Sequence, residues 1–200
     1  MKPTKVILFI LFLTGINLFA QQREDYSKYP GYFNYKDVPG LKNAETLSEV
    51  YLEETLLKMV SGLTEENSDG IGSMIDGLKL IQVTEYKIDQ MGIVDMESSL
   101  ESIDNGMQSK NWDRIVRTKS RGNFTNIYIK KSSGAGFEGL TILSLSKKEK
   151  NEESGEKYGK LTCVNIVGKI DMSKIGKLTK ELNIPGMDGL KEIDKAKGKK

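Results

Sequence analysis

Two central stretches of the chain carry apolar residues at the spacing of one helix face. Residues 55–63 repeat apolar side chains at i, i+3, i+4 and i+7, so this side of a helix is expected to pack against a sheet. A second helix is predicted from Asp95, whose carboxylate can cap the first turn, to about Ser109. The apolar positions are Leu56, Met59, Val60 and Leu63 in the first helix, and Met96, Leu100, Ile103 and Met107 in the second.

Six runs are rich in β-branched and aromatic residues and are bounded by turn formers, as strands are. The first run is ambiguous, because the same residues could extend the helix that follows it. The third and fourth flank a short connection of turn formers and predict a hairpin. The last two are the most apolar and predict central strands, separated by a charged linker, Lys147–Lys160. The runs are Ser48–Leu52, Leu78–Tyr86, Trp112–Lys119, Phe124–Lys130, Leu140–Ser146 and Leu161–Ile170.

The C-terminal part of the chain predicts one more helix and then a tail. Asp171 or Ser173 can cap this helix, and its apolar residues share a face until Pro185 and Gly186 end it. Residues 185–200 are rich in lysine and are expected to form a flexible, solvated extension. The apolar positions of the helix are Met172, Ile175, Leu178 and Leu182.

The first twenty residues have the three parts of a secretory signal peptide. Lys2 and Lys5 form a basic start, an apolar stretch of about 14 residues follows from Val6, and a small residue stands at Ala20. A membrane-spanning helix needs about 20 apolar residues, so we expect cleavage after Ala20 and no membrane segment in the mature chain. The mature protein would then begin at Gln21 and work outside the cytoplasm, in the periplasm or beyond.

An irregular aromatic lead-in, residues 21–44, separates the signal from the patterned region. Aromatic side chains interrupted by proline and glycine cannot form a regular helix or strand here. Since aromatic area is normally buried, we expect the lead-in to pack onto the domain as a strap, with a binding surface as the alternative. The aromatic residues are Tyr26, Tyr29, Tyr32, Phe33 and Tyr35.

Composition excludes several classes of function. Without the two lysines of the signal, the 30 basic residues become 28 and balance the 28 acidic ones, so the mature region has no formal net charge. This balance argues against a nucleic-acid partner, which requires clustered Lys and Arg. The chain has no histidine, which removes the commonest general base and metal ligand. The single cysteine, Cys163, has no disulfide partner, and its apolar run predicts a buried, unreactive thiol.

Two stretches match known motifs only in part. Gly134–Gly139 matches the glycine fingerprint of dinucleotide-binding folds, but a strand is predicted after it where the motif needs a helix, so we expect a turn. The other stretch resembles a calcium loop whose first and last ligands are of unusual type, and Gly72 stands where an apolar residue is usual. Its residues are Glu65, Asn67, Asp69, Gly70 and Asp76.

Carboxylates are frequent but their spacing does not define an acid–base pair. Those of the second predicted helix stand beside its apolar stripe and are expected to face water. They are Asp95, Glu97, Glu101 and Asp104. We therefore assign no catalytic, cofactor-binding or metal-ligating residue, and we expect no cofactor.

Four features stand in a recognisable order along the chain. They are the signal with its lead-in, the segment Ser48–Val60, the strand pair Trp112–Lys119 and Asn126–Lys130, and the run Val164–Asp171 before the last helix. Together they resemble a family of exported bacterial proteins described as domain of unknown function 4252, found mainly in Bacteroidetes-type bacteria. The resemblance covers most of residues 45–182 and implies a periplasmic or envelope protein without assigned chemistry.

The elements together predict a single α+β domain over residues 45–184, with a mostly antiparallel sheet of five or six strands and about three helices packed on one face. By elimination, we expect a non-enzymatic envelope domain that binds a protein or peptide, at an open sheet edge or through the aromatic lead-in. Two alternatives stay open: a hydrolase whose carboxylates are assembled by the fold, and a carrier of a small ligand or lipid. A pocket with two carboxylates of displaced pKa would indicate the first, and an enclosed apolar cavity the second.

Overall fold

The computed structural model describes residues 24–63, 71–120, 123–134, 136–150 and 155–171. Three predictions lie outside these residues: the signal peptide, the last helix and the lysine-rich tail. Four of the five ligand positions of the calcium-like stretch also lie outside them, and only Asp76 is described.

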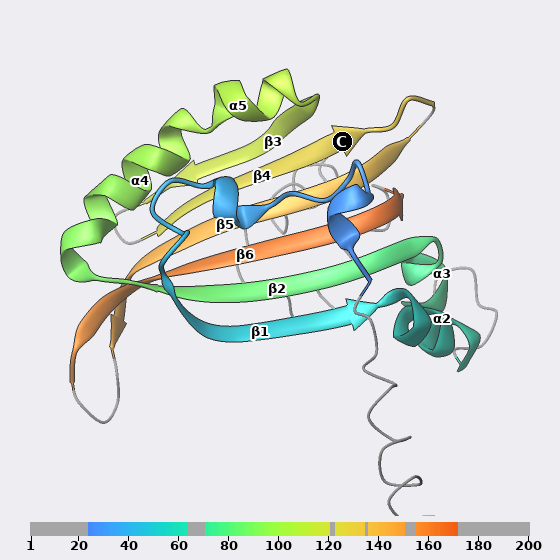
Figure 1. Ribbon diagram of the computed structural model, residues 1–200, viewed down its shortest axis with the longest axis horizontal. Helices are drawn as coiled ribbons and strands as arrows, with labels where there is room; N and C mark the ends of the chain where they lie inside the picture. Colours follow the sequence, from blue (N-terminus) through green and yellow to red (C-terminus); the bar gives the residue numbers. More distant parts are fainter. Residues whose placement is uncertain (1–23, 64–70, 121–122, 135, 151–154, 172–200) are drawn as a thin grey trace, which may run out of the picture.

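Six strands form one sheet in which every neighbouring pair is antiparallel (Figure 1). Their order across the sheet is β1-β2-β6-β5-β4-β3. This confirms the predicted fold class, a single α+β domain built on an antiparallel sheet. The strands are β1 (Glu45–Glu53), β2 (Leu78–Ile88), β3 (Trp112–Lys119), β4 (Asn123–Lys131), β5 (Phe137–Lys150) and β6 (Lys157–Ile170).

Four helices accompany the sheet, and none of the described helices is long and apolar enough to cross a membrane. They are α2 (Glu54–Leu63), α3 (Ile71–Ile75), α4 (Ile93–Ser102) and α5 (Asp104–Ser109). Three single 3-10 turns are η2 (Tyr26–Lys28), η3 (Tyr35–Asp37) and η4 (Gln90–Gly92).

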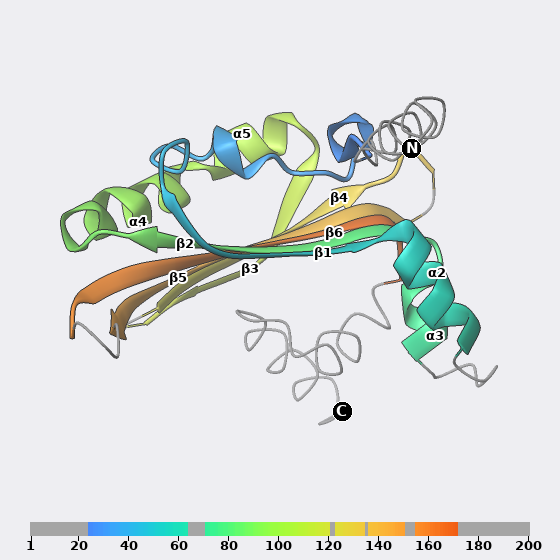
Figure 2. The same cartoon turned by 60° about the horizontal axis from the view of Figure 1, so that its bottom comes forward.

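Side chains of the sheet alternate between two faces, each with its own apolar cluster. One face, here called the strap face, carries Leu143 and Cys163 and lies beneath the lead-in, α4 and α5 (Figure 2). The opposite face, here called the far face, carries Ile142 and packs with Leu57 of α2 and Ile75 of α3. The structure thus divides the helices between the two faces, where the sequence predicted one.

The helix predicted from Asp95 begins earlier and bends. Its first residue is Ile93, after Gly92 at the N-cap, so Asp95 lies in the first turn and the capping prediction is wrong. The preceding turn η4 already directs the chain into the helix, which removes the need for a side-chain cap. The periodicity was read correctly, since Met96, Leu100 and Met107 are buried on the strap face.

In α2 the predicted buried stripe is wrong. Leu57 is the buried residue, at 3% exposure, whereas Leu56 and Met59 are 42% and 57% exposed. Of the three predicted positions whose side chains are described, only Val60 packs partly on the far-face cluster, and the side chain of Leu63 lies outside the described part. The helix follows β1 without a loop, so the direction of the strand fixes its rotation and turns Leu57 toward the sheet.

Two strand predictions are settled by the pairing. The ambiguous run Ser48–Leu52 belongs to a strand, because its residues pair with β2 from Glu45↔Lys87 to Glu53↔Leu80. The charged linker Lys147–Lys160 is mostly strand, since β5 continues to Lys150 and pairs there with Lys157 of β6. Charged side chains can extend a hairpin beyond the core because both of its faces then meet solvent.

The lead-in crosses the strap face as an irregular segment, residues 26–41, which we call the strap (Figure 1). The ring of Phe33 packs edge-on against the ring of Trp112, and the two ring centroids are 6.2 Å apart. Two backbone atoms of Phe33 also bond to the side chain of Asn165, which lies fully buried in β6. The strap residues that are at most 6% exposed are Tyr26, Phe33, Tyr35, Val38 and Leu41.

Two glycines set the height of the strap above the sheet. A Cβ atom on Gly31 would lie 1.7 Å from the carbonyl oxygen of Glu138, and one on Gly139 would lie 2.4 Å from the carbonyl oxygen of Gly31. Only a residue without a side chain allows the two backbones to approach so closely. Gly139 is the third glycine of the dinucleotide-like motif, so part of that motif serves strap packing instead.

Candidate functional site: an open sheet edge and its flanking cleft

Strand β1 forms one edge of the sheet and pairs only with β2 among the described residues. Its residues Glu45–Val50 are all exposed. The register shifts between Thr46 and Ser48, which makes Leu47 a bulge residue, and the rest of the strand pairs without interruption. An uninterrupted edge of this kind offers backbone N–H and C=O groups to an added strand.

Exposed apolar side chains lie on this edge strand and on the helix that follows it. Four of the seven large apolar residues that are exposed in the described part of the chain lie on β1 and α2, and we call them the β1–α2 patch. Scattered exposed apolar residues are ordinary, but a group along one open edge marks an interaction surface. The patch consists of Leu47 (39% exposed), Val50 (49%), Leu56 (42%) and Met59 (57%).

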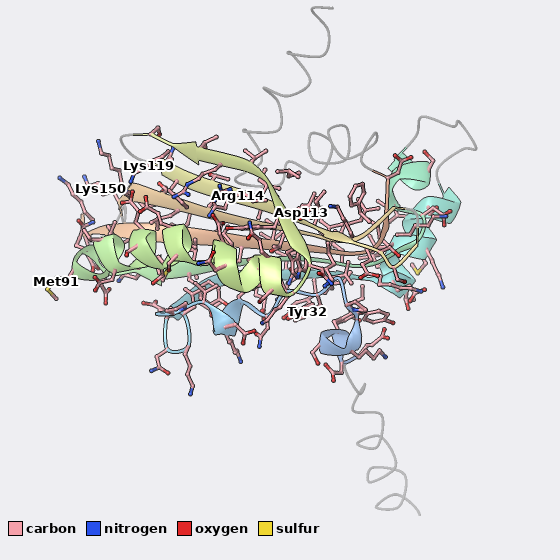
Figure 3. The ribbon with its side chains drawn as sticks, turned by 90° about the horizontal axis from the view of Figure 1, so that it is seen from above. Tyr32, Met91, Asp113, Arg114, Lys119 and Lys150 are labelled. Atoms are coloured by element: carbon pink, nitrogen blue, oxygen red, sulfur yellow. The ribbon has the colours of Figure 1, made fainter. Side chains whose placement is uncertain are left out.

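The opposite edge strand, β3, differs from β1 because it carries a bulge and several ion pairs. A register shift between Arg114 and Val116 places a bulge at Ile115, in the middle of the strand. The bulge brings Arg114 and Arg117 onto the same face of the sheet, where alternation alone would separate them. Both then pair with carboxylates of α4 and α5, as Lys119 at the end of the same strand does; Figure 3 labels Arg114 and Lys119. A central bulge and inward-directed charges protect an edge from pairing, so β1 is the more receptive edge.

The carboxylates expected to face water on the second helix are therefore partly paired, which corrects that prediction. Glu97 is bonded by Lys147 and, at 3.1 Å, by Lys119. Glu101 lies 2.7 Å from Lys119 and 3.7 Å from Arg117, and Asp104 is paired with Arg114. The phenol of Tyr128 also donates to Asp104 at 2.6 Å. These contacts fasten α4 and α5 to the sheet.

The chemistry of this charged cluster does not favour acid catalysis. Hydrogen bonds from Lys147 and Lys119 hold the pKa of Glu97 below its ordinary value of 4.5, against the effect of burial. A general acid working near neutrality requires the opposite displacement. The cluster thus behaves as a set of structural ion pairs.

Replacing Glu97 by glutamine should lower the stability by about 1 kcal/mol at neutral pH, because a charged hydrogen-bond acceptor is lost. The folded pKa of Glu97 is depressed, so its contribution is present above the ordinary pKa of 4.5 and is lost as the pH falls through the folded value. Urea unfolding at a series of pH values should show the two proteins converging in acid. A difference that persists unchanged in acid would contradict the ion-pair role.

A cleft of about 500 Å³ opens where β1 begins. It lies between the end of the strap, the end of β2 and the start of α4. At its rim Met91 is 92% exposed and projects from the end of the molecule (Figure 3). Val94, the second residue of α4, is 72% exposed. The lining residues are Pro39, Gly40, Asn43, Ala44, Lys87, Ile88, Asp89, Met91, Gly92, Asp95, Met96 and Ser99.

A family model with the description "Domain of unknown function (DUF4252)" matches residues 35–178. The chain belongs to this family. The match begins inside the strap, so the DUF4252 domain includes part of the lead-in that the sequence comparison had left outside. No curated protein and no solved structure shows significant similarity to the chain.

The motifs examined in the sequence take ordinary structural places in this DUF4252 domain. Gly134 and Gly136 lie in the connection between β4 and β5, whereas the residues from Phe137 to Gly139 already belong to β5, so the predicted turn is shorter than the motif and a strand follows it. Cys163 is fully buried, which confirms its predicted burial, and burial raises the pKa of its thiol well above the ordinary value. In the described part of the chain, no group of three or more acidic or cysteine side chains is placed to hold a metal ion.

Proposed function

We propose that this protein is an exported envelope domain that binds a protein partner by accepting a strand at the edge of β1. Export rests on the signal-like pattern of residues 1–20 and on the resemblance to exported bacterial proteins. The observation that supports binding is the β1–α2 patch, which places Leu47 and Val50 on the sheet edge that has no neighbour in the described residues, and Leu56 and Met59 on the helix that follows it. The strap is a weaker candidate, because its aromatic residues are largely used in packing.

In strand addition, the backbone and the side chains make different contributions to binding. The backbone of β1 would supply the hydrogen bonds, and alternate side chains would set the specificity. Val50 lies near the middle of the strand and pairs with Val83 of β2. A partner strand would therefore bury Val50 further, at no cost to the packing already present.

The test uses the chain recovered from the envelope fraction. We expect its mass to correspond to a start at Gln21, and we expect it to retain a stoichiometric partner under mild conditions. With that partner purified, Val50→Lys should weaken binding by about tenfold or more, because a charge is then forced into the added strand. The stability of the free protein should change little, since Val50 is half exposed.

The matched control is Ile115→Lys, which places the same charge on the other edge strand at 36% exposure. It should leave binding unchanged. A chain that starts at Met1 inside the cell, the recovery of no stoichiometric partner, or equal binding by Val50→Lys and wild type would each overturn the proposal.

The hydrolase alternative gains no support from the described residues. Each carboxylate of α4 and α5 except Asp95 is paired with lysine or arginine. The carrier alternative would need an enclosed apolar cavity, whereas the cleft beside β1 is lined by both polar and apolar residues at the end of the sheet.

A further inference from the structure

The β1 edge and its cleft are acidic. Glu45 and Glu49 lie on β1, and Asp89 and Asp95 line the cleft. The basic residues nearby are Lys87, which lines the cleft, and Lys42, which precedes β1 by two residues of loop. At the far end of the strand the charges are balanced differently, since Glu54 pairs with both Lys58 and Lys79 at 2.6 Å. Carboxylates therefore outnumber lysines at the start of β1 and in the cleft.

Among the described residues, the carboxylates at the start of β1 and in the cleft are only partly neutralised. Lys87 is shared, at 3.3 Å from Glu156 and 4.0 Å from Glu45. Glu49 accepts hydrogen bonds from the hydroxyls of Tyr51 at 2.8 Å and Thr84 at 3.5 Å, neither of which brings a charge. Asp89 and Asp95 have no salt bridge to any described residue. On the other edge, by contrast, the acidic and basic side chains compensate one another.

The cleft continues the edge. Asn43 and Ala44 immediately precede β1, and Ile88 and Asp89 end the strand that pairs with it. A strand added antiparallel to β1, as every other neighbour in the sheet is, would point its C-terminal end toward this cleft. The thioether of Met91 at the rim is an adaptable apolar contact for a long side chain.

Resting on the strand-addition function proposed above, we infer that the partner strand is cationic, with Lys or Arg alternating with branched apolar residues. Its apolar side chains pack on Val50 and its cations face Glu49. The long side chain at its C-terminal end enters the cleft, where the stem packs on Met91 and the charged head meets Asp89 and Asp95. This arrangement uses the aliphatic stem and the charge of one basic residue together.

The test is fluorescence anisotropy with a capped, labelled peptide as long as β1 that alternates lysine and valine, added to the mature chain. We expect saturable binding, and we expect Glu49→Lys and Asp95→Lys each to weaken it by about tenfold. The matched control is Asp113→Lys, a charge reversal on the opposite edge strand, which should leave binding unchanged. Circular dichroism of each variant verifies that it is folded.

Two control peptides separate the contributions. A peptide with glutamate in place of lysine should not bind, and the lysine peptide with alternate amides N-methylated should lose binding because it cannot pair with an edge. If Val50→Lys abolishes binding but the charge reversals do not, the cationic inference fails while strand addition stands. Failure of the lysine peptide to bind at low salt overturns the inference. Sedimentation showing that the chain alone associates through β1 would overturn it in favour of a second copy.

Discussion

Replacing Gly31 by alanine is expected to lower the free energy of unfolding by about 3 kcal/mol and to lift the strap from the sheet. The added Cβ would lie 1.7 Å from the carbonyl oxygen of Glu138 and 2.4 Å from its carbonyl carbon. Both are backbone atoms of β5 and cannot rotate away as a side chain would. The strap must move, and the buried contacts of Phe33 and Tyr35 move with it.

Urea unfolding measures the loss, and hydrogen exchange of the strap amides shows whether the strap has left the sheet. Gly134→Ala is the matched control, because no atom lies within 4 Å of a Cβ added there and its stability should change by less than about 0.5 kcal/mol. Gly139→Ala meets the same contact from the other side. The double variant should therefore cost less than the sum of the two single ones. Wild-type stability in Gly31→Ala would show that the strap is not seated as described.

Five of the six strands were predictable because each is a run of branched and aromatic residues long enough to stand out from its surroundings, whereas β1 was ambiguous and is identified by its pairing with β2. The order of the strands in the sheet was harder to predict from the sequence. Hairpin turns put β3 beside β4 and β5 beside β6, but nothing local places β6 between β2 and β5. That insertion decides that β1 is an edge, and hence where the candidate site lies. The edge could be anticipated in general and located only in the folded sheet.

The predicted side-chain directions are wrong where a local irregularity interrupts the periodicity of a strand or helix. In β3 the bulge at Ile115 moves Arg114 to the face of Arg117, which gives the carboxylates of α4 and α5 their partners. In α2 the abrupt start after β1 rotates the helix and exposes Leu56. A one-residue change in register inverts the faces of a strand, so periodicity alone could not have found either outcome.

The strap illustrates the same limit at long range. Its aromatic residues predicted packing, but their partner Asn165 lies 132 residues from Phe33 in the sequence. Asn165 stands in one of the two most apolar strand runs, where a polar residue is the visible anomaly. A buried asparagine in a central strand requires hydrogen-bond partners, and that requirement is the one signal that could have indicated the strap contact.

The second large effect is expected at this asparagine. Asn165→Leu should lower the free energy of unfolding by about 3 kcal/mol, although leucine fills a similar volume. The Asn165 amide donates to the carbonyl of Phe33 at 2.8 Å and to the side-chain oxygen of Gln82 at 3.3 Å, and its oxygen accepts from the Phe33 N–H at 3.4 Å. Three buried polar groups would lose a partner at once. If the strap lifts from the sheet, water can reach these three polar groups, and this limits the loss of stability.

Because both variants release the strap, Asn165→Leu combined with Gly31→Ala should destabilise the protein by clearly less than the sum of the single changes. Thr125→Val is the control, since it removes the 2.9 Å hydroxyl contact to Ser144 on the far face, where the strap does not reach, and should cost no more than about 1 kcal/mol. Urea unfolding of the single and double variants distinguishes the outcomes. Full additivity would mean that Asn165 stabilises the sheet independently of the strap, and a neutral Asn165→Leu would mean that the strap holds by apolar packing alone.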